Sequence, residues 1–340
     1  MAAGLSSPVL VGRDDDLGRL RAALDVVIGG APRIVVIGGE AGIGKTRLVT
    51  EFTTTVVREG SRVLVGGCLD LAEGGPPFLP FVEALRRLVR ETPPESRADV
   101  LGPAGAELAR LIPDLVEGTP DAAEPIPSIE QNRLFELVLA TIGRLGRKRP
   151  FVLVIEDAHW IDRASRDLVT FLARNLSHEP LLLLLTWRSD FLPPEHATAT
   201  WLAELLRQPR SGRIDLGRLG RRDVGRLLEA LSGRRSPGAD VERLWERTDG
   251  NPFFVEELVA GEAAGNGSGA GAVAPRTIVG IVEGRLAGLS QPARTVLAAL
   301  AVAGRPVDEA LVLDVAGGSA EELRAGLREV VDRHVIEIDE

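Results

Sequence analysis

The stretch VVIGGEAGIGKTRLV, residues 35–49, places four glycines and a lysine between an apolar run and the first turn of a predicted helix. Glycine loses the most backbone freedom on folding, so a cluster of glycines at this junction needs a physical reason. Gly39, Gly44, Lys45 and Thr46 fit the spacing G-x-x-x-x-G-K-[ST], with a predicted strand before them and a predicted helix after them. This pattern predicts a P-loop, a loop that binds phosphate groups.

The chemistry of such a loop explains its residues. Glycines let successive backbone N–H groups face an anion, and the following helix directs the positive end of its dipole at the same point. We expect Lys45 to reach the β- and γ-phosphates and the Thr46 hydroxyl to ligate Mg²⁺. The expected nucleotide-binding residues of the loop are Gly39, Ala41, Gly42, Ile43, Gly44, Lys45, Thr46 and Arg47. The alternative is a glycine-rich turn that binds nothing.

Four short apolar runs predict buried strands at residues 33–38, 62–67, 151–156 and 181–187. Their hydrophobicity is nearly continuous, as a parallel sheet covered on both faces requires. Helical patterns separate them, at 45–58, 81–90, 132–145 and 166–176. The predicted fold class is therefore α/β, a P-loop NTPase with a doubly wound parallel sheet.

The pattern divides the chain into three predicted domains. The α/β domain spans 1–215, with a proline-rich insertion at about 91–128 that carries a short helix near 106–111. A helical lid domain spans 216–275, and its end, from 261, is a Gly- and Ala-rich stretch that we expect to be a flexible linker. Residues 276–340 predict three short helices and a final strand, a winged-helix-like pattern. The apolar run at the end suggests a fragment cut at a domain boundary.

Composition limits the possible environments and partners. No run approaches the roughly 20 apolar residues that span a bilayer, and the N-terminus lacks the pattern of a secretory signal, so we expect a cytoplasmic protein without a membrane partner. The net charge of −9 argues against a surface built for nucleic acid. Cys68, the single cysteine, follows an apolar run and is expected to be a small buried side chain. Residues 213–233 predict a short strand followed by an amphipathic helix, and for the arginine-rich stretch 207–226 we expect a solvated helix face.

A P-loop needs an acidic partner at the end of another strand, and the run FVLVIEDAHW, residues 151–160, supplies Glu156 and Asp157. Glu156 would hold Mg²⁺, directly or through water, and Asp157 would orient or deprotonate the attacking water. The alternative is a solvated turn or a helix cap. Trp160 and Asp162 follow, for which packing and helix capping are the simpler interpretations.

The fourth predicted strand ends in LLTWRSD, residues 184–190. Arg188 would emerge at the same edge of the sheet as Glu156, where its guanidinium could contact the γ-phosphate. A surface ion pair with Asp190 is the alternative. The candidate catalytic residues are thus Asp157, Glu156, Lys45 and Arg188, with Thr46 and Glu156 as the Mg²⁺ ligands.

Five motifs in sequence order carry a family resemblance: LVGRDDDLGRL, GGEAGIGKTRLV, LVIEDAHWIDRAS, LLTWRSD and DGNPFFVEEL. Together they resemble the nucleotide-binding module of the STAND signal-transduction ATPases, and within them the large ATP-binding LuxR-type transcriptional regulators. The resemblance implies that Val11, Gly12 and Arg13 line the adenine pocket and that Pro252 packs near the base in an ADP-bound closed form. The residues alone predict only a helix stop, a turn and a new helix at 250–252.

The resemblance implies an ATP/ADP-binding switch that self-associates in its ATP state. Where many P-loop ATPases have a water-orienting glutamate, this chain has Asp157, which is one methylene shorter, so we expect slow ATP hydrolysis. The DNA-binding helix-turn-helix of LuxR-type members is absent from this chain, so DNA would be a partner only through a further domain. The alternatives are a motor-type or initiator-like ATPase acting on nucleic acid, and a P-loop kinase with an unknown acceptor.

Overall fold

The computed structural model describes residues 7–70, 76–102, 128–190, 196–263, 286, 289–303, 307–317, 319–332 and 336. The chain divides into two compact units, each described here by itself. The sheet unit comprises residues 9–223, and the helical unit comprises residues 1–8 together with 224–340. The predicted helix near 106–111 lies outside the described residues.

A single parallel sheet of five strands forms the centre of the sheet unit. The strands, in the spatial order β2-β3-β4-β1-β5, are β2 Arg62–Gly67, β3 Phe151–Glu156, β4 Leu181–Arg188, β1 Arg33–Gly39 and β5 Ser211–Asp215. The four predicted apolar strands and the predicted α/β fold class are confirmed. β4 lies between β1 and β3, so its last residues stand between the P-loop and the β3 carboxylates.

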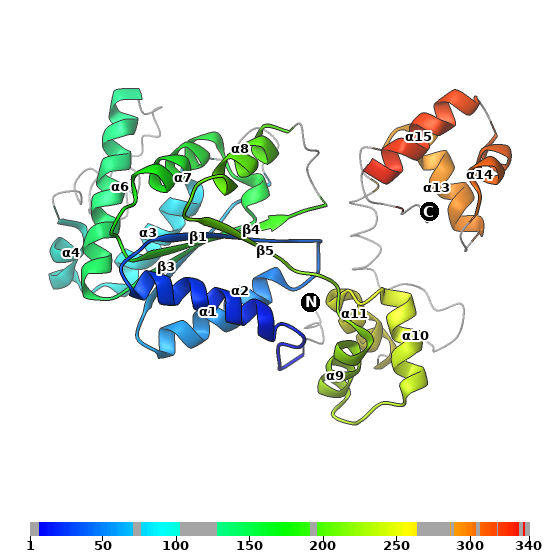
Figure 1. Cartoon of the computed structure of the whole chain (residues 1–340), viewed down its shortest axis with the longest axis horizontal. Coiled ribbons are helices and arrows are strands. Elements are labelled where there is room, and N and C mark those ends of the chain that lie inside the picture. Colours follow the sequence, from blue (N-terminus) through cyan, green and yellow to red (C-terminus); the bar gives the residue numbers. More distant parts are fainter. Residues whose placement is uncertain are drawn as a thin grey trace. The chain divides into compact units, whose positions relative to one another are not determined.

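Helices cover both faces of this sheet (Figure 1). α1 Asp14–Ile28 and α2 Lys45–Arg58 pack on one face, and α3 Leu79–Glu91, α6 Ser128–Lys148, α7 Arg163–Asn175 and α8 Ala197–Leu206 pack on the other, beside α4 Pro94–Leu101. Neighbouring residues of one strand enter opposite cores: Ile34 and Val36 belong to the core on the side of α3 and α7, and Val35 and Ile37 belong to the core on the side of α1 and α2. Burial on both faces is why the strands show no polar alternation.

The four helical patterns of the α/β part coincide with α2, α3, α6 and α7, and those predictions are confirmed. In the described part of the sheet unit, the helices α1, α4 and α8 were not predicted. The signal for α1 was present, because Leu20, Leu24 and Val27 recur at helical spacing and are fully buried against the sheet.

Among the described residues, the helical unit contains α10 Gly238–Thr248, α11 Pro252–Ala263, α13 Gln291–Ala303, α14 Glu309–Ala316 and α15 Ala320–Asp332, with most of α9 Arg221–Ser232. Small cores hold its last three helices together, as where Val296, Val312 and Leu323 meet. The three predicted C-terminal helices are thus confirmed. Most of the predicted linker, from residue 264, and the predicted final strand lie outside the described residues, so the winged-helix assignment and the predicted domain boundaries stay predictions.

Candidate functional site

The P-loop joins the end of β1 to the start of α2. Its glycines take backbone angles that other residues rarely adopt, with φ of 76° at Gly42 and 100° at Gly44, the N-cap of α2. The backbone N–H groups of Gly42 and Gly44 donate to none of the residues that the structure describes. Together with the first turn of α2, they form a site suited to an anion.

Lys45, the first residue of α2, lies buried beneath this loop. Its Nζ donates hydrogen bonds to the carbonyls of Gly39, at 2.8 Å, and Glu40, at 2.7 Å. Burial lowers the pKa of Lys45 to about 8, although Asp190 and Asp157 act in the opposite direction. Backbone carbonyls thus hold the ammonium group at the phosphate loop. Because the group is already buried, it loses little hydration when an anion takes the place of these carbonyls.

Thr46 and Glu156 meet across the sheet edge, where their side chains form a hydrogen bond. Burial and the neighbouring Asp157 raise the pKa of Glu156, and the bond from Thr46 partly offsets this. Magnesium in nucleotide sites takes one or two protein oxygens, with phosphates and water completing the shell. The Thr46 hydroxyl and the Glu156 carboxylate are protein oxygens of the kind that such a magnesium site uses. Within the described residues, no group of three or more His, Cys, Asp or Glu side chains could hold a metal ion by itself.

Asp157 follows β3 in a left-handed backbone conformation, with φ 53° and ψ 44°. This region is uncommon for residues other than glycine, although Asp tolerates it better than most. The backbone N–H of Asp157 donates to Thr186 Oγ1 of β4 at 2.8 Å, which fixes the turn. Burial raises the pKa of Asp157, while Lys45 and Arg188 lower it. The carboxylate therefore lies within the electrostatic reach of the P-loop lysine.

Arg188, the last residue of β4, pairs in register with Gly39 of β1 and lies at the expected edge of the sheet. Its guanidinium is 3.6 Å from the Asp190 carboxylate, so the ion pair that the sequence left as an alternative exists. A contact from Arg188 to a γ-phosphate stays a prediction. The charge of Arg188 acts on both Asp157 and Lys45, where it lowers their pKa values.

Two residues that sequence reasoning left without a role support this edge from beneath. Thr186 holds the turn at Asp157, and His159 lies buried with its ring 4.4 Å from the Trp160 ring and 6.2 Å from the Trp187 ring, centre to centre. Burial lowers the pKa of His159 to about 3, with Arg188 adding to the shift. The signal for Thr186 was its position as a polar residue at the end of an apolar strand.

The residues after the acidic pair behave as packing and capping groups. Trp160 is half-buried and packs against the main core. Asp162 caps α7, where its carboxylate accepts from the Ser165 N–H at 2.9 Å and the Ser165 hydroxyl at 2.6 Å. The simpler interpretations of Trp160 and Asp162 are confirmed. Cys68 is buried, as expected, and burial raises the pKa of its thiol.

The segment expected to line the adenine pocket, residues 11–13, lies against the P-loop. The Arg13 guanidinium is buried and donates to the carbonyls of Ile43, at 3.0 Å, and Gly217, at 2.7 Å. Burial lowers the pKa of Arg13, and Asp16, 3.8 Å away, partly compensates. Gly12 has φ 67°, and a Cβ there would lie 2.9 Å from Leu219 and Asp223. The roles of Val11, Gly12 and Arg13 toward adenine stay predictions.

Sequence reasoning missed the β5–α9 segment, residues 216–220, which continues this contact with the P-loop. The Leu216 N–H donates to the Gly38 carbonyl at 2.9 Å, and the Arg218 guanidinium binds both Glu40 carboxylate oxygens at 3.0–3.2 Å. The loop that would hold phosphate is thus bonded on one side to the connection between β5 and α9. No local sequence pattern marks a contact between residues so far apart in the chain.

The prediction of one solvated helix face for 207–226 was wrong in its middle part. The stretch runs from the C-cap of α8 through β5 into α9. Arg210 donates to the Leu176 carbonyl at 2.6 Å, and Arg213 pairs with Asp215 at 2.8 Å. The reason is β5, a mostly exposed edge strand whose polar residues resemble a helix surface in the sequence.

Pro252 begins α11 in the helical unit. Asp249 and Gly250 end α10 with positive φ of 46° and 70°, and the Asn251 side chain accepts from the Phe253 N–H at 3.1 Å. The helix stop, turn and helix start predicted from the residues are confirmed. A contact between Pro252 and a nucleotide base stays a prediction. No helix in the described part of the chain is long and apolar enough to span a bilayer.

Residues 9–184 match the family described as AAA ATPase domain. An uncharacterized protein of Rhizobium meliloti (strain 1021) is 29% identical over 208 residues, which are 56% of this chain and 19% of the relative. This chain thus corresponds to about a fifth of that protein's length.

Several solved structures have a similar course of the chain. One is a STAND protein with a tetratricopeptide repeat sensor from Pyrococcus horikoshii. Its TM-score is 0.46 and its sequence identity 18%, and the match covers 99% of this chain and 41% of that one. The Drosophila ORC bound to DNA has a TM-score of 0.48 and 14% identity over 98% of this chain and 77% of that one. The Aeropyrum pernix ORC1 protein in complex with DNA has a TM-score of 0.42 and 15% identity, over 96% and 85%.

The family match is the decisive comparison, because it takes in more than half of the chain and contains both the P-loop and the β3 carboxylates. Members of such a family bind a nucleotide, and the anion-binding loop, the buried lysine and the facing acidic pair described above are the parts that this binding requires. The chain belongs to the AAA ATPase domain family.

Proposed function

We propose that this chain is an ATP- and ADP-binding switch that hydrolyses ATP slowly, the core of a STAND-type signalling protein of the LuxR-type transcriptional regulators. One observation carries the proposal. At a single edge of the sheet, the glycine-bounded loop with Lys45 and Thr46 faces Glu156 and Asp157, and Thr46 is already hydrogen-bonded to Glu156.

Nucleotide binding rests on residues 39–47 in this proposal. The loop amides and Lys45 bind the phosphates, and Lys45 exchanges its bonds with the carbonyls of Gly39 and Glu40 for bonds with phosphate oxygens. Thr46 and Glu156 would hold Mg²⁺, which neutralises charge that develops on the phosphates. Val11, Gly12 and Arg13 complete the site on the side of the base.

Hydrolysis depends on Asp157, whose carboxylate would orient the attacking water. The left-handed turn and the bond from its N–H to Thr186 fix the backbone, so the short side chain cannot approach the water by a shift of the main chain. A misplacement of order 1 Å costs about 100-fold in rate, which accounts for slow turnover. Arg188 would stabilise the γ-phosphate in the transition state, and its pairing with Asp190 keeps it at this edge.

The switch has a physical route in the β5–α9 segment. Arg13 and Arg218 bond the P-loop to the connecting segment 216–220, and this segment runs into α9 and from there into the helical unit. A change in the loop on gain or loss of the γ-phosphate would therefore act on the connection between the units. To move the population from 1:99 to 99:1, the affinities of the two forms must differ by about 5.5 kcal/mol. Pro252 would supply part of that difference in the ADP form.

The experiment compares nucleotide affinity by titration calorimetry and turnover by phosphate release. We expect Lys45→Ala to weaken ADP and ATP binding at least about 100-fold, because it removes a buried charge from the phosphates. Asp157→Asn should bind nucleotide normally and hydrolyse less, whereas Asp157→Glu, which restores the longer side chain, should raise turnover about tenfold or more. Unchanged ATP affinity in Lys45→Ala would refute the site.

A second arm separates the switch from an ATPase acting on nucleic acid. Turnover is measured with and without duplex DNA at two salt concentrations. For the switch we expect no stimulation by DNA, in keeping with the net charge of −9. Salt-sensitive stimulation would support the initiator-like alternative and count against the switch.

A further inference from the structure

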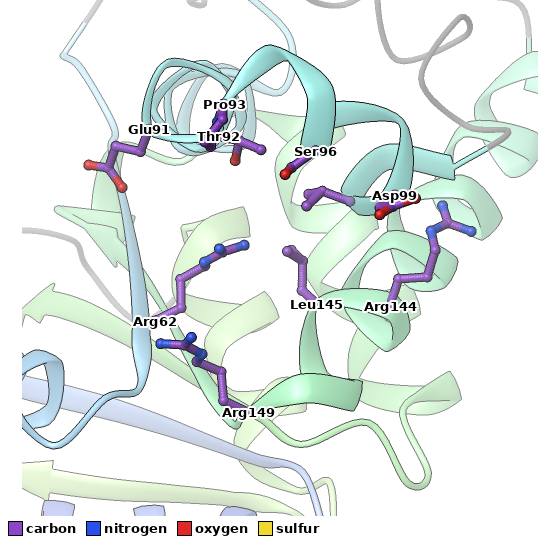
Figure 2. Close-up of a pocket in the computed structure, with 10 residues that line it drawn as sticks. Arg62, Glu91, Thr92, Pro93, Ser96, Asp99, Arg144, Leu145 and Arg149 are labelled. Carbon is purple, nitrogen blue, oxygen red and sulfur yellow. The ribbon is translucent and has the colours of Figure 1, made fainter.

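A pocket of about 240 Å³ lies at the edge of the sheet opposite the P-loop (Figure 2). It is bounded by the first residue of β2, the end of α3 with α4, and the end of α6. Arg62 of β2 pairs in register with Phe151, the first residue of β3, so the pocket sits where these strands begin. The nucleotide residues lie where the strands end. The two sites therefore occupy opposite ends of the same sheet.

Three guanidinium groups, from three separate parts of the chain, line this pocket: Arg62, Arg144 and Arg149. Figure 2 shows Arg62 pointing into the space below the turn between α3 and α4, with Arg149 beside it. The Arg62 side chain forms no hydrogen bond with any described residue, and within the described part of the chain none of the three arginines forms an ion pair. In Figure 2 the Arg144 guanidinium lies apart from the other two, beyond Leu145 and beside Asp99. Like charges repel one another, so the closeness of Arg62 and Arg149 favours an anion beside them.

The remaining contacts of the arginines leave donors available. Arg144 donates to the Leu101 carbonyl at 2.6 Å and to the Thr141 hydroxyl at 3.2 Å, and its buried Nε has no partner among the described residues. Arg149 donates one bond, to the Gly60 carbonyl at 2.8 Å. Since a guanidinium carries five N–H donors, each of these side chains retains donors for a ligand.

The acidic residues of the pocket do not neutralise this charge. Glu91 is already paired with Arg87, its neighbour on α3, at 2.7 Å. Asp99 is the other carboxylate, and the pocket also contains the hydroxyls of Thr92 and Ser96. Among the described residues the pocket has three arginines but only one carboxylate without an ion pair, so positive charge is in excess, and the hydroxyls add donors for oxygen atoms. The lining is that of an oxyanion site.

We propose that this pocket binds a small, doubly charged oxyanion, a phosphate or a dicarboxylate group, as a second ligand site independent of the nucleotide. Arginine matches these groups because its planar fork donates two parallel bonds to two oxygens. The volume is below that of pockets for drug-sized ligands, about 300–1,000 Å³, so the ligand is compact. No pattern in the sequence marks this site, because its arginines are scattered among many others.

The test uses inorganic phosphate and succinate as separate probes in titration calorimetry with the whole chain. Because phosphate can also occupy the P-loop, each titration is repeated in the Lys45→Ala variant. Arg62→Gln is the diagnostic variant, since Arg62 has no hydrogen bond in the described structure whose loss would disturb the fold. Arg147→Gln, an exposed arginine of α6 outside the pocket, is the matched control. Thermal unfolding verifies that each variant folds.

We expect at least one probe to bind equally well in wild type, Lys45→Ala and Arg147→Gln, and at least about tenfold more weakly in Arg62→Gln, because a charge-assisted bond is lost. The affinity should also fall with added salt. Which probe binds identifies the group. The proposal is overturned if neither binds, if binding disappears in Lys45→Ala but not in Arg62→Gln, or if Arg147→Gln weakens binding as much as Arg62→Gln.

Discussion

His159 illustrates how a single residue beside the site responds to its surroundings. Its side chain is fully buried, between the rings of Trp160 and Trp187. Burial lowers its pKa to about 3, and the nearby charges of Arg188 and Lys45 add to this. The imidazole is therefore neutral at pH 7, and its 4.0 Å approach to the Asp157 carboxylate is not an ion pair. Its role is to pack beneath the acidic turn.

A pH dependence of stability follows from His159. Below a pH of about 6.5 the unfolded chain protonates this histidine while the folded chain does not until about pH 3, so stability falls as the pH drops across that range. At pH 5 this loss is about 2 kcal/mol. Urea unfolding at pH 7 and at pH 5 measures this loss of stability. We expect His159→Gln to lose less stability than the wild type between pH 7 and pH 5. The exposed His178, changed to Gln, is the control. Equal losses in both variants would contradict the assignment.

At the scale of elements, Gly66 sets how closely β2 meets α3. A Cβ at Gly66 would lie 1.8 Å from the Pro80 carbonyl oxygen, a backbone atom in the first turn of α3. Rigid backbone stands on both sides, so no side-chain rotation can relieve the contact. Close approach of β2 and α3 thus depends on glycine at this position.

We predict that Gly66→Ala lowers the free energy of unfolding by about 3 kcal/mol, because α3 must move away from the sheet. Gly212→Ala, in β5, is the matched control: a Cβ there meets nothing within 4 Å. Urea unfolding of the two variants is the measurement. If Gly66→Ala were as stable as Gly212→Ala, the close approach of β2 and α3 would not be a constraint.

The buried Arg13 connects two elements, the P-loop and the β5–α9 segment, by its bonds to Ile43 and Gly217. If its role is to position the loop, Arg13→Gln should weaken binding of ATP and of tripolyphosphate by the same factor, about tenfold, because both depend on the loop amides. If Arg13 instead contacts adenine, Arg13→Gln should weaken the binding of ATP but not that of tripolyphosphate. Calorimetry with both ligands separates the two, and the exposed Arg90, changed to Gln, is the control.

At the scale of the whole molecule, the question is how nucleotide changes the association of chains. In the proposed switch, ATP with Mg²⁺ favours an open form that can assemble, and ADP favours the closed form. We predict a larger sedimentation coefficient with a non-hydrolysable ATP analogue than with ADP. Lys45→Ala should show no difference between the two. Identical sedimentation of the wild type with both nucleotides would exclude assembly as the output.

The sequence by itself determined the parts that depend on neighbours along the chain. A strand buried on both faces must be apolar throughout, so β1 to β4 were visible as runs, and the P-loop was visible because its glycines, lysine and threonine act at fixed spacing. The same holds for the cap at Asp162 and the helix start at Pro252. Local geometry requires particular residues at those positions, and the requirement appears in the sequence.

Only the tertiary structure decided what depends on partners distant in the chain. The strand order placed β4, with Thr186, between the P-loop and Asp157. It also brought Gly217 to Arg13, and Arg62 to Arg144 in the second pocket. The sequence predicted a short strand at β5 but showed no apolar run there, because an edge strand needs little apolar surface. Contacts of this kind arise from the way the elements pack, and packing leaves no fixed spacing in the sequence from which they could be inferred.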